Sequence, residues 1–237
     1  MPSSGRCLAV LILLLPCAPA LAGPWPRAEK GMFLSLSDER DRDGNNYIGL
    51  YGEYGLTGRE TLGFELGHTN VGETSAIFWL QHGLEPIGEN RFALSLGLGM
   101  IQRDGILMPV GQAGADWGRG FGGVLNGGWM SLETRVKVAG TTEDEQDFQE
   151  LEPSAFNYLT AEVTSKADLT LGLHATDRTM FINQLRLEQR EDTGFSSKIA
   201  TSVVHDLIGP AKIELGLITP ISGPDEEAVK VGTWLEF

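Results

Sequence analysis

The sequence has little cysteine, and both of its cysteines lie close to the amino terminus. Cys7 and Cys17 are the only two in 237 residues. They fall in a segment with the features of an export signal: Arg6, an apolar run at 8–15 and a small-x-small cleavage site at 20–22. Cleavage at the end of that site would leave a chain without cysteine, which excludes disulfides and thiolate chemistry.

Cleavage after Ala22 has two alternatives, a lipoprotein and an uncleaved anchor. A lipoprotein would use Cys17, but Pro16 stands where lipoprotein processing requires a small residue. An uncleaved helical anchor would need about 20 apolar residues, and the run here is shorter. We therefore expect a signal peptide at 1–22 and a single mature domain at 23–237.

Long apolar runs and positive charge are also scarce. After residue 22 no stretch approaches the roughly 18 consecutive apolar residues of a transmembrane helix. The chain has 18 Lys+Arg and 32 Asp+Glu, so loss of Arg6 leaves 17 against 32, a formal charge of −15. Such an acidic chain is a poor nucleic-acid binder. No clustered metal-ligand spacing is present, and we expect no metal and no cofactor.

What the chain does contain is a two-residue alternation of apolar and polar side chains. In the clearest case Phe92, Leu94 and Leu96 share one face, while Arg91 and Ser95 lie on the other. This period is typical of a strand with two unlike faces. Turn-forming residues separate twelve such segments. The expected strands are 31–38, 47–56, 60–70, 74–84, 90–103, 106–117, 128–140, 158–176, 179–190, 195–206, 211–219 and 228–237.

Two of these assignments leave alternatives open. The glycine-rich stretch 104–127 is either a strand followed by a turn or one long loop. In the second case the long run at 158–176 divides at Ser165-Lys166, and the count remains twelve. An even number of similar strands permits closure into an all-β, antiparallel, up-and-down transmembrane barrel.

A soluble sandwich also alternates, so alternation alone does not select a membrane barrel. Closure is required in a bilayer, because edge strands would leave backbone groups unpaired in hydrocarbon. Many polar-face positions are also small, as a curved lumen requires. The positions concerned are Gly49, Ala93, Ser95, Gly97, Gly99, Ser131, Ala200, Ser202 and Gly216.

The carboxyl terminus supports the membrane barrel. Lys230, Gly232, Leu235 and Phe237 match the polar, Gly, apolar and final aromatic positions of a terminal-strand signal. In this the chain resembles Gram-negative outer-membrane β-barrels, and its general layout is similar to uncharacterised barrels linked with phenol-degradation pathways. The resemblance implies the outer membrane, contact with its lipid and lipopolysaccharide, and recognition by the barrel-assembly machinery. The last strand should pair with the first.

The alternation places similar numbers of acids and bases on the lumen face. Lys166, Asp168, Lys230 and Glu236 share the phase of the main set. The expected lumen charges are Glu53, Glu65, Arg91, Glu133, Arg135, Lys137, Glu162, Arg186, Glu188, Lys198, Lys212 and Glu214. The excess acid then falls in loops near 38–43, 143–152, 191–192 and 225–227. A balanced lumen is either filled by paired charges or open to small polar or zwitterionic solutes.

Aromatic residues near strand ends are expected to form interfacial girdles. They are Tyr47, Tyr54, Trp117, Trp129, Tyr158 and Phe237. The segment 77–80 is apolar on both faces, so Trp79 is either buried inside or part of a protein contact.

An enzymatic barrel would need a His beside a Ser, and none of the four histidines forms a His-x-Ser pair. Only His174 projects inward by phase. We therefore expect no enzyme but a passive channel or transport component for a small polar solute. The alternatives are a sealed structural or interaction barrel and a lipid-modifying enzyme.

Overall fold

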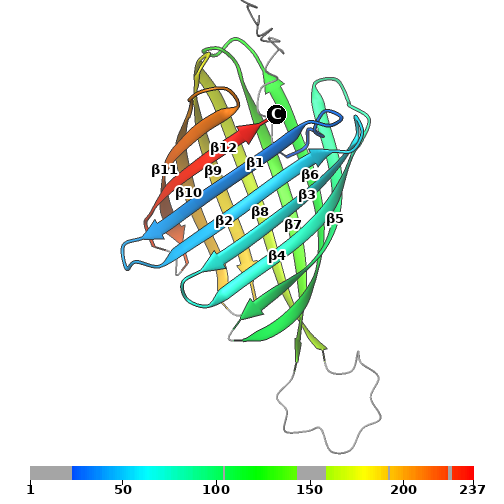
Figure 1. Cartoon of the computed structure of the whole chain (residues 1–237), viewed down its shortest axis with the longest axis vertical. Helices are drawn as coiled ribbons and strands as arrows, with labels where there is room; N and C mark the ends of the chain where they lie inside the picture. Colours follow the sequence, from blue (N-terminus) through cyan, green and yellow to red (C-terminus); the bar gives the residue numbers. More distant parts are fainter. Residues whose placement is uncertain (1–22, 104, 143–158, 192, 224–225) are drawn as a thin grey trace, which may run out of the picture.

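The computed structural model describes residues 23–103, 105–142, 159–191, 193–223 and 226–237. Twelve antiparallel strands form one closed barrel in which every strand pairs with its sequence neighbours and β1 pairs with β12 (Figure 1). The strands are β1 (Met32–Asp41), β2 (Asn46–Gly55), β3 (Glu60–Thr69), β4 (Glu73–Gly83), β5 (Asn90–Arg103), β6 (Ile106–Phe121), β7 (Gly128–Thr142), β8 (Leu159–Thr176), β9 (Thr179–Arg190), β10 (Gly194–Asp206), β11 (Ala211–Ser222) and β12 (Ala228–Glu236). The predicted twelve-stranded barrel is confirmed.

The closing pair joins the two ends of the chain, as the sequence predicted. Phe33 lies opposite Glu236, and the register runs without a shift to Asp41 opposite Ala228. The backbone N–H of Met32 donates to Phe237 O at 3.0 Å, and that of Phe237 donates to Met32 O at 2.9 Å. We call this end of the barrel the terminus end, and the other end the far end.

Three strands run three or more residues beyond their predicted bounds, and one of them is β11, which continues to Ser222. β1 continues through the charged residues to Asp41, although we expected a loop from Asp38, because its backbone remains paired with β2 and β12. β6 runs on to Phe121, so the glycine-rich stretch is a strand and a turn rather than one long loop. β8 is a single strand, and it pairs with β7 from Leu159 to Leu173.

The outside of the barrel is apolar. Leu96, Leu98 and Leu217 are 72%, 75% and 63% exposed, although each lies within a strand. In water this surface would be unfavourable, at about 25 cal/mol for each Å². Hydrocarbon removes that cost, and closure leaves no strand edge to solvate. Among the described residues there is no helix whose length and hydropathy would let it cross a membrane.

Many of the buried side chains form two clusters inside the barrel. One cluster contains Trp129, Met180 and Val204, with Trp25 and Trp234 packed against it. A second contains Ile77, Trp79, Val110 and Ala139. Trp79 is therefore buried in the lumen, which is one of the two alternatives left open by the sequence.

Candidate functional site

The lumen contains a cavity of about 730 Å³. It extends from Glu73 and Thr193 near the far end to Arg27 and Trp129 towards the terminus end. Seven acidic and eight basic side chains line it, so its surface is charged but nearly balanced. This contrasts with the apolar outer surface and gives the barrel two chemically distinct faces.

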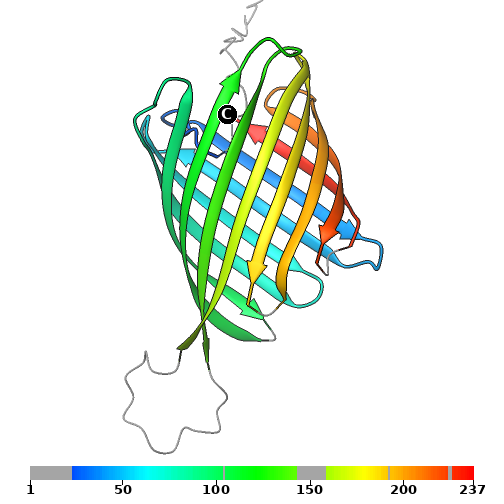
Figure 2. The ribbon, with the colours of Figure 1, turned by 180° about the vertical axis from the view of Figure 1, so that it is seen from behind.

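The two signs of charge are unevenly placed around the cavity. The wall formed by β1 to β4 contributes the acids Glu39, Glu65 and Glu73. The facing wall, seen from behind in Figure 2, carries most of the bases. From β7 to β10 these are Arg135, Lys137, Lys166, Arg186, Arg190 and Lys198, interspersed with Glu133, Asp168 and Glu188. Such a distribution creates an electric field across the lumen.

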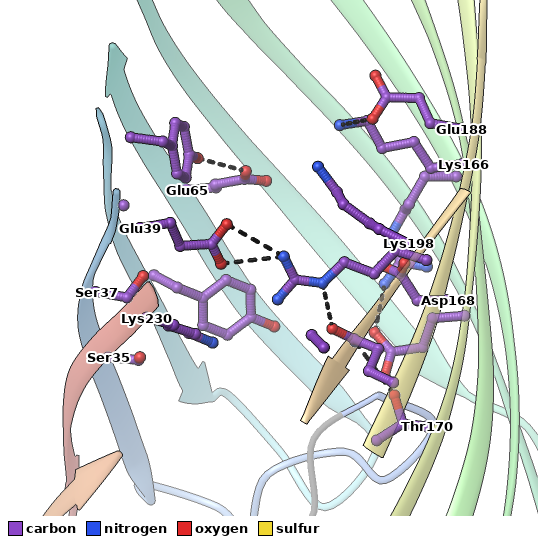
Figure 3. Close-up of a pocket in the computed structure, with 18 of the residues that line it drawn as sticks. Ser35, Ser37, Glu39, Glu65, Lys166, Asp168, Thr170, Glu188, Lys198 and Lys230 are labelled. Atoms are coloured by element: carbon purple, nitrogen blue, oxygen red, sulfur yellow. Dashed lines mark hydrogen bonds and ion pairs between the residues drawn. The ribbon is translucent and has the colours of Figure 1, made fainter. Parts of the chain in front are cut away.

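Two ion pairs connect the facing walls. Arg186 Nη1 of β9 lies 3.0 and 3.3 Å from the two carboxylate oxygens of Glu39 in β1 (Figure 3). Lys137 Nζ of β7 lies 3.8 Å from Glu65 Oε2 in β3, and the Tyr47 hydroxyl donates to Glu65 at 3.3 Å. The strands of each pair are not adjacent in the barrel, so both pairs span the lumen.

Hydrogen bonds along the basic wall orient these charges. Arg186 Nε donates to Gln184 Oε1 at 2.6 Å, and Gln184 Nε2 donates to the Thr170 hydroxyl at 3.2 Å (Figure 3). Lys166 Nζ lies 3.0 Å from Glu188. The Arg186 guanidinium is therefore held from its own wall while it extends towards Glu39.

Aromatic side chains form the floor of the cavity. Phe33 and Trp234 meet edge to face with centroids 5.6 Å apart, and Tyr51 and Trp79 lie 5.3 Å apart. The guanidinium carbon of Arg27 lies 4.6 Å from the Phe33 ring centre. Contacts of this kind favour a fixed arrangement, each worth roughly 0.5–1.5 kcal/mol.

Beyond this aromatic floor, the residues that precede β1 fill part of the terminus end. Residues 23–31, which we call the N-terminal segment, precede β1 and lie inside the barrel mouth (Figure 1). Gly23 O accepts from Gln81 Nε2 at 2.9 Å, and the Arg27 N–H donates to the Thr61 hydroxyl at 2.9 Å. Pro24 is fully buried. Residues 23–27 thus belong to the packed interior, whereas 28–30 are exposed.

Arg27 fastens the N-terminal segment through its side chain. Its Nε lies 2.5 Å from Glu53, and its Nη1 lies 3.4 Å from Glu236. Arg27 and Glu53 are 8% and 5% exposed. Because removal of one partner from a buried ion pair leaves the other charge uncompensated, this contact resists withdrawal of the segment.

The structure distributes the predicted lumen charges among three places. Glu53 and Lys212 lie at the filled terminus end, where Lys212 Nζ is 3.6 Å from Glu236. Two more lie outside the cavity lining. Arg91 donates a hydrogen bond to the backbone carbonyl of Gly88 in a turn, and Glu162 forms an ion pair with Arg103 at 3.2 Å. The others line the cavity. They are Glu65, Glu133, Arg135, Lys137, Arg186, Glu188, Lys198 and Glu214, together with Lys166, Asp168 and Lys230.

Several site residues were not found from the sequence. Glu39 was assigned to a loop, although the inward phase of Phe33 continues through Ser35 and Ser37 to reach it. Arg27 lies before the first strand, where alternation gives no information. Asp116, which binds Gln81 at 3.0 Å and also Arg135, lay in the ambiguous glycine-rich stretch.

The girdle prediction was wrong for Tyr47 and Trp129. Tyr47 lines the cavity and Trp129 is 4% exposed, because both follow the inward phase of their strands. Tyr54 and Phe237 are exposed, and Trp117 is partly exposed with its indole N–H on Asn90. Tyr158 lies outside the described residues.

His174 projects inward, as its phase predicted. Its ring centre lies 5.7 Å from that of Trp129, which places it at the filled end of the lumen. The other three histidines bond to neighbouring strands: His68 to Thr74, His82 to Glu60 and His205 to Thr179. Among the described residues no group of three His, Cys, Asp or Glu is arranged to hold a metal ion.

Comparison with known proteins shows the fold. No protein-family model and no characterised protein sequence matches this chain. Among solved structures it is similar to the NanC porin, with TM-score 0.57 and 8% identity over 86% of this chain and 100% of that one. The KdgM porin gives a TM-score of 0.54 at 8% identity, over 86% of this chain and 99% of that one. The translocator domain of the autotransporter NalP from Neisseria meningitidis gives a TM-score of 0.51 at 10% identity, over 87% of this chain and 88% of that one.

The fold and lumen therefore define a porin-like transmembrane β-barrel. Its structural neighbours include two porins and an autotransporter translocator domain, and at 8–10% identity this likeness concerns the fold.

Proposed function

We propose that this chain is an outer-membrane channel or transport component for a small polar solute. The charged cavity inside an apolar barrel is the observation that carries the proposal. Facing acids and bases stabilise both signs of a polar solute and favour neither simple cations nor simple anions. Passage through the terminus end requires the N-terminal segment to shift, so this segment controls opening.

A swelling assay tests the proposal. Proteoliposomes placed in an isotonic arabinose solution should swell faster than protein-free liposomes. The variant Arg27→Ala should swell faster than wild type, because it releases Glu53 and Glu236 from their contact with the N-terminal segment. Absence of swelling with both proteins, each shown to be folded in the bilayer, would contradict a channel. It would support the sealed barrel, the alternative that the filled terminus end favours.

Three further parts of this proposal concern the two ends of the chain and the acidic loops. Residues 1–22 are an export signal cleaved after Ala22, so Edman sequencing of protein from isolated outer membranes should begin at Gly23. Lys230, Gly232, Leu235 and Phe237 serve as the signal read by the assembly machinery. The acidic loops contact lipopolysaccharide on the outside of the cell. Sequencing that begins upstream of Gly23 would contradict the cleavage site.

A further inference from the structure

The Glu39–Arg186 pair lies inside the cavity and offers two opposite charges to a solute. Both residues line the cavity, and the side chains of Glu39 and Arg186 are 17% and 21% exposed, respectively. Arg186 Nε donates a hydrogen bond to Gln184, whereas its Nη1 donates to both carboxylate oxygens of Glu39. The pair is thus accessible from the cavity, and its cation is anchored from behind (Figure 3).

The surroundings of the pair reinforce its two poles. The positive charges of Lys198 and Lys230 also act on the Glu39 carboxylate. Lys230 is itself held at 3.0 Å by Glu214. On β1 the hydroxyls of Ser35 and Ser37 line the cavity beside Glu39 (Figure 3). The Glu39 carboxylate therefore lies in a part of the cavity that both cations and hydroxyls line.

Separation of this pair selects the charge type of the solute. A simple anion that binds Arg186 displaces Glu39 and removes the closest cation from its carboxylate, which then keeps only the weaker attraction of Lys198 and Lys230. A simple cation that binds Glu39 removes the closest carboxylate from the guanidinium in the same way. Loss of the closest opposite charge in a partly desolvated site is unfavourable, so both exchanges are penalised. A solute carrying both charges replaces each partner and leaves every charge paired.

We propose that a small zwitterion binds between Glu39 and Arg186. The solute carboxylate accepts hydrogen bonds from the Arg186 guanidinium, and the solute ammonium donates to the Glu39 carboxylate. The cavity of about 730 Å³ has room for such a molecule together with water. This inference rests on the proposed channel and names the class of solute that the channel binds.

Equilibrium dialysis of the folded, detergent-solubilised full chain against radiolabelled glycine tests the inference. Excess unlabelled glycine should displace the label, while glycolate, ethanolamine and glycolamide, similar in size but lacking one or both charges, should compete at least about 10-fold less well. Equal competition by glycine and glycolate, or by glycine and ethanolamine, would overturn the inference. This comparison needs only wild-type protein, so it does not depend on whether any variant folds.

Variants identify the site. Glu39→Gln and Arg186→Gln should each weaken glycine binding by about 10-fold or more, since each removes one pole. The double exchange Glu39→Arg with Arg186→Glu restores both charges and should recover binding. The control Arg59→Gln, which breaks the exposed pair with Glu85 in a turn outside the lumen, should bind as wild type. Unchanged binding in both single variants would overturn the site.

The outcomes also separate this inference from the proposed function. Swelling without selective glycine binding would contradict the zwitterion site and leave the channel intact. Selective glycine binding without solute flux would contradict the channel and leave the binding site intact.

Discussion

At the residue scale, the acidic side chains of the far-end loops interact across the barrel rim. The charge of Asp43, in the β1–β2 loop, raises the pKa of Glu226, in the β11–β12 loop, above its usual value. Since the pKa is raised on folding, this group favours the folded state most at low pH. That contribution is lost as the pH rises through the raised pKa.

Asp43→Asn should therefore lower the pKa of Glu226 towards its usual value. Carbon-13 NMR titration of the Glu226 carboxyl group measures this directly. The control Glu29→Gln, at the terminus end, should leave the titration unchanged. High salt should lower the pKa in wild type for the same reason, because exposed charges are screened. A Glu226 titration insensitive to both Asp43→Asn and salt would contradict the interaction.

Residue placement was predictable wherever the alternation of a strand was unbroken. Arg186, Glu188 and Lys137 were assigned to the lumen in this way, and they line the cavity. Glu39 was missed because a run of six charged residues, 38–43, is typical of a loop. Its backbone is nevertheless paired on both sides, and Arg186 neutralises its carboxylate. Pairing across the lumen joins residues that are distant in sequence, so no local pattern records it.

At the element scale, the N-terminal segment depends on small residues in the strands around it. A Cβ atom on Gly118 of β6 would lie 2.4 Å from Pro24 Cγ and 2.5 Å from the Trp25 ring. Real Cβ atoms do not approach so closely, so the segment would have to move. The strand periodicity gave no indication of this segment, because it lies outside any strand and its contacts with Gln81, Thr61 and Glu53 join residues distant in sequence.

Gly118→Ala should displace the N-terminal segment, at an overpacking cost of roughly 1–3 kcal/mol. We expect faster trypsin cleavage after Arg27, measured by mass spectrometry, and faster arabinose swelling. Gly111→Ala is the matched control in the same strand, because a Cβ there meets nothing within 4 Å. Equal cleavage and swelling in Gly118→Ala and wild type would show that the segment is not seated as described.

The terminal strand β12 provides a second test at this scale. Phe237 is 62% exposed on the outside, while its backbone is bonded to Met32. Phe237→Ala keeps the backbone bonds and removes only the aromatic side chain. If the assembly machinery reads that side chain, less heat-modifiable barrel should accumulate in the outer membrane. Ile208→Ala, an exposed apolar change in a turn, is the control. Wild-type assembly of Phe237→Ala would contradict the signal.

At the scale of the whole molecule, the outer surface distinguishes a membrane barrel from a soluble one. Leu96 lies in the middle of β5 and is 72% exposed, so it faces hydrocarbon in a bilayer. Leu96→Arg should lower the free energy of unfolding from lipid vesicles by about 2–4 kcal/mol. Denaturant titration in those vesicles measures the change.

Ile208→Arg is the control for that experiment. Ile208 is 89% exposed but lies in a turn at the terminus end, where an arginine reaches water. A much smaller change is expected there. Equal effects of the two substitutions would contradict a barrel whose middle lies in hydrocarbon.

The lumen and the loops divide the charge of the molecule between them. The whole chain has a formal charge of −14, yet the cavity lining is nearly balanced. Excess acid near the far end lies in exposed positions such as Asp43, Glu226 and Glu227. A balanced lumen predicts a pore that distinguishes weakly between potassium and chloride.

Single-channel recording in planar bilayers tests the central claim most directly. Wild type should show discrete, infrequent current steps with weak selectivity between potassium and chloride. Gly118→Ala should open more often, because its N-terminal segment is displaced. Silence of both proteins across a range of salt concentrations, with each shown to be folded in the bilayer, would contradict the claim that this barrel conducts small polar solutes.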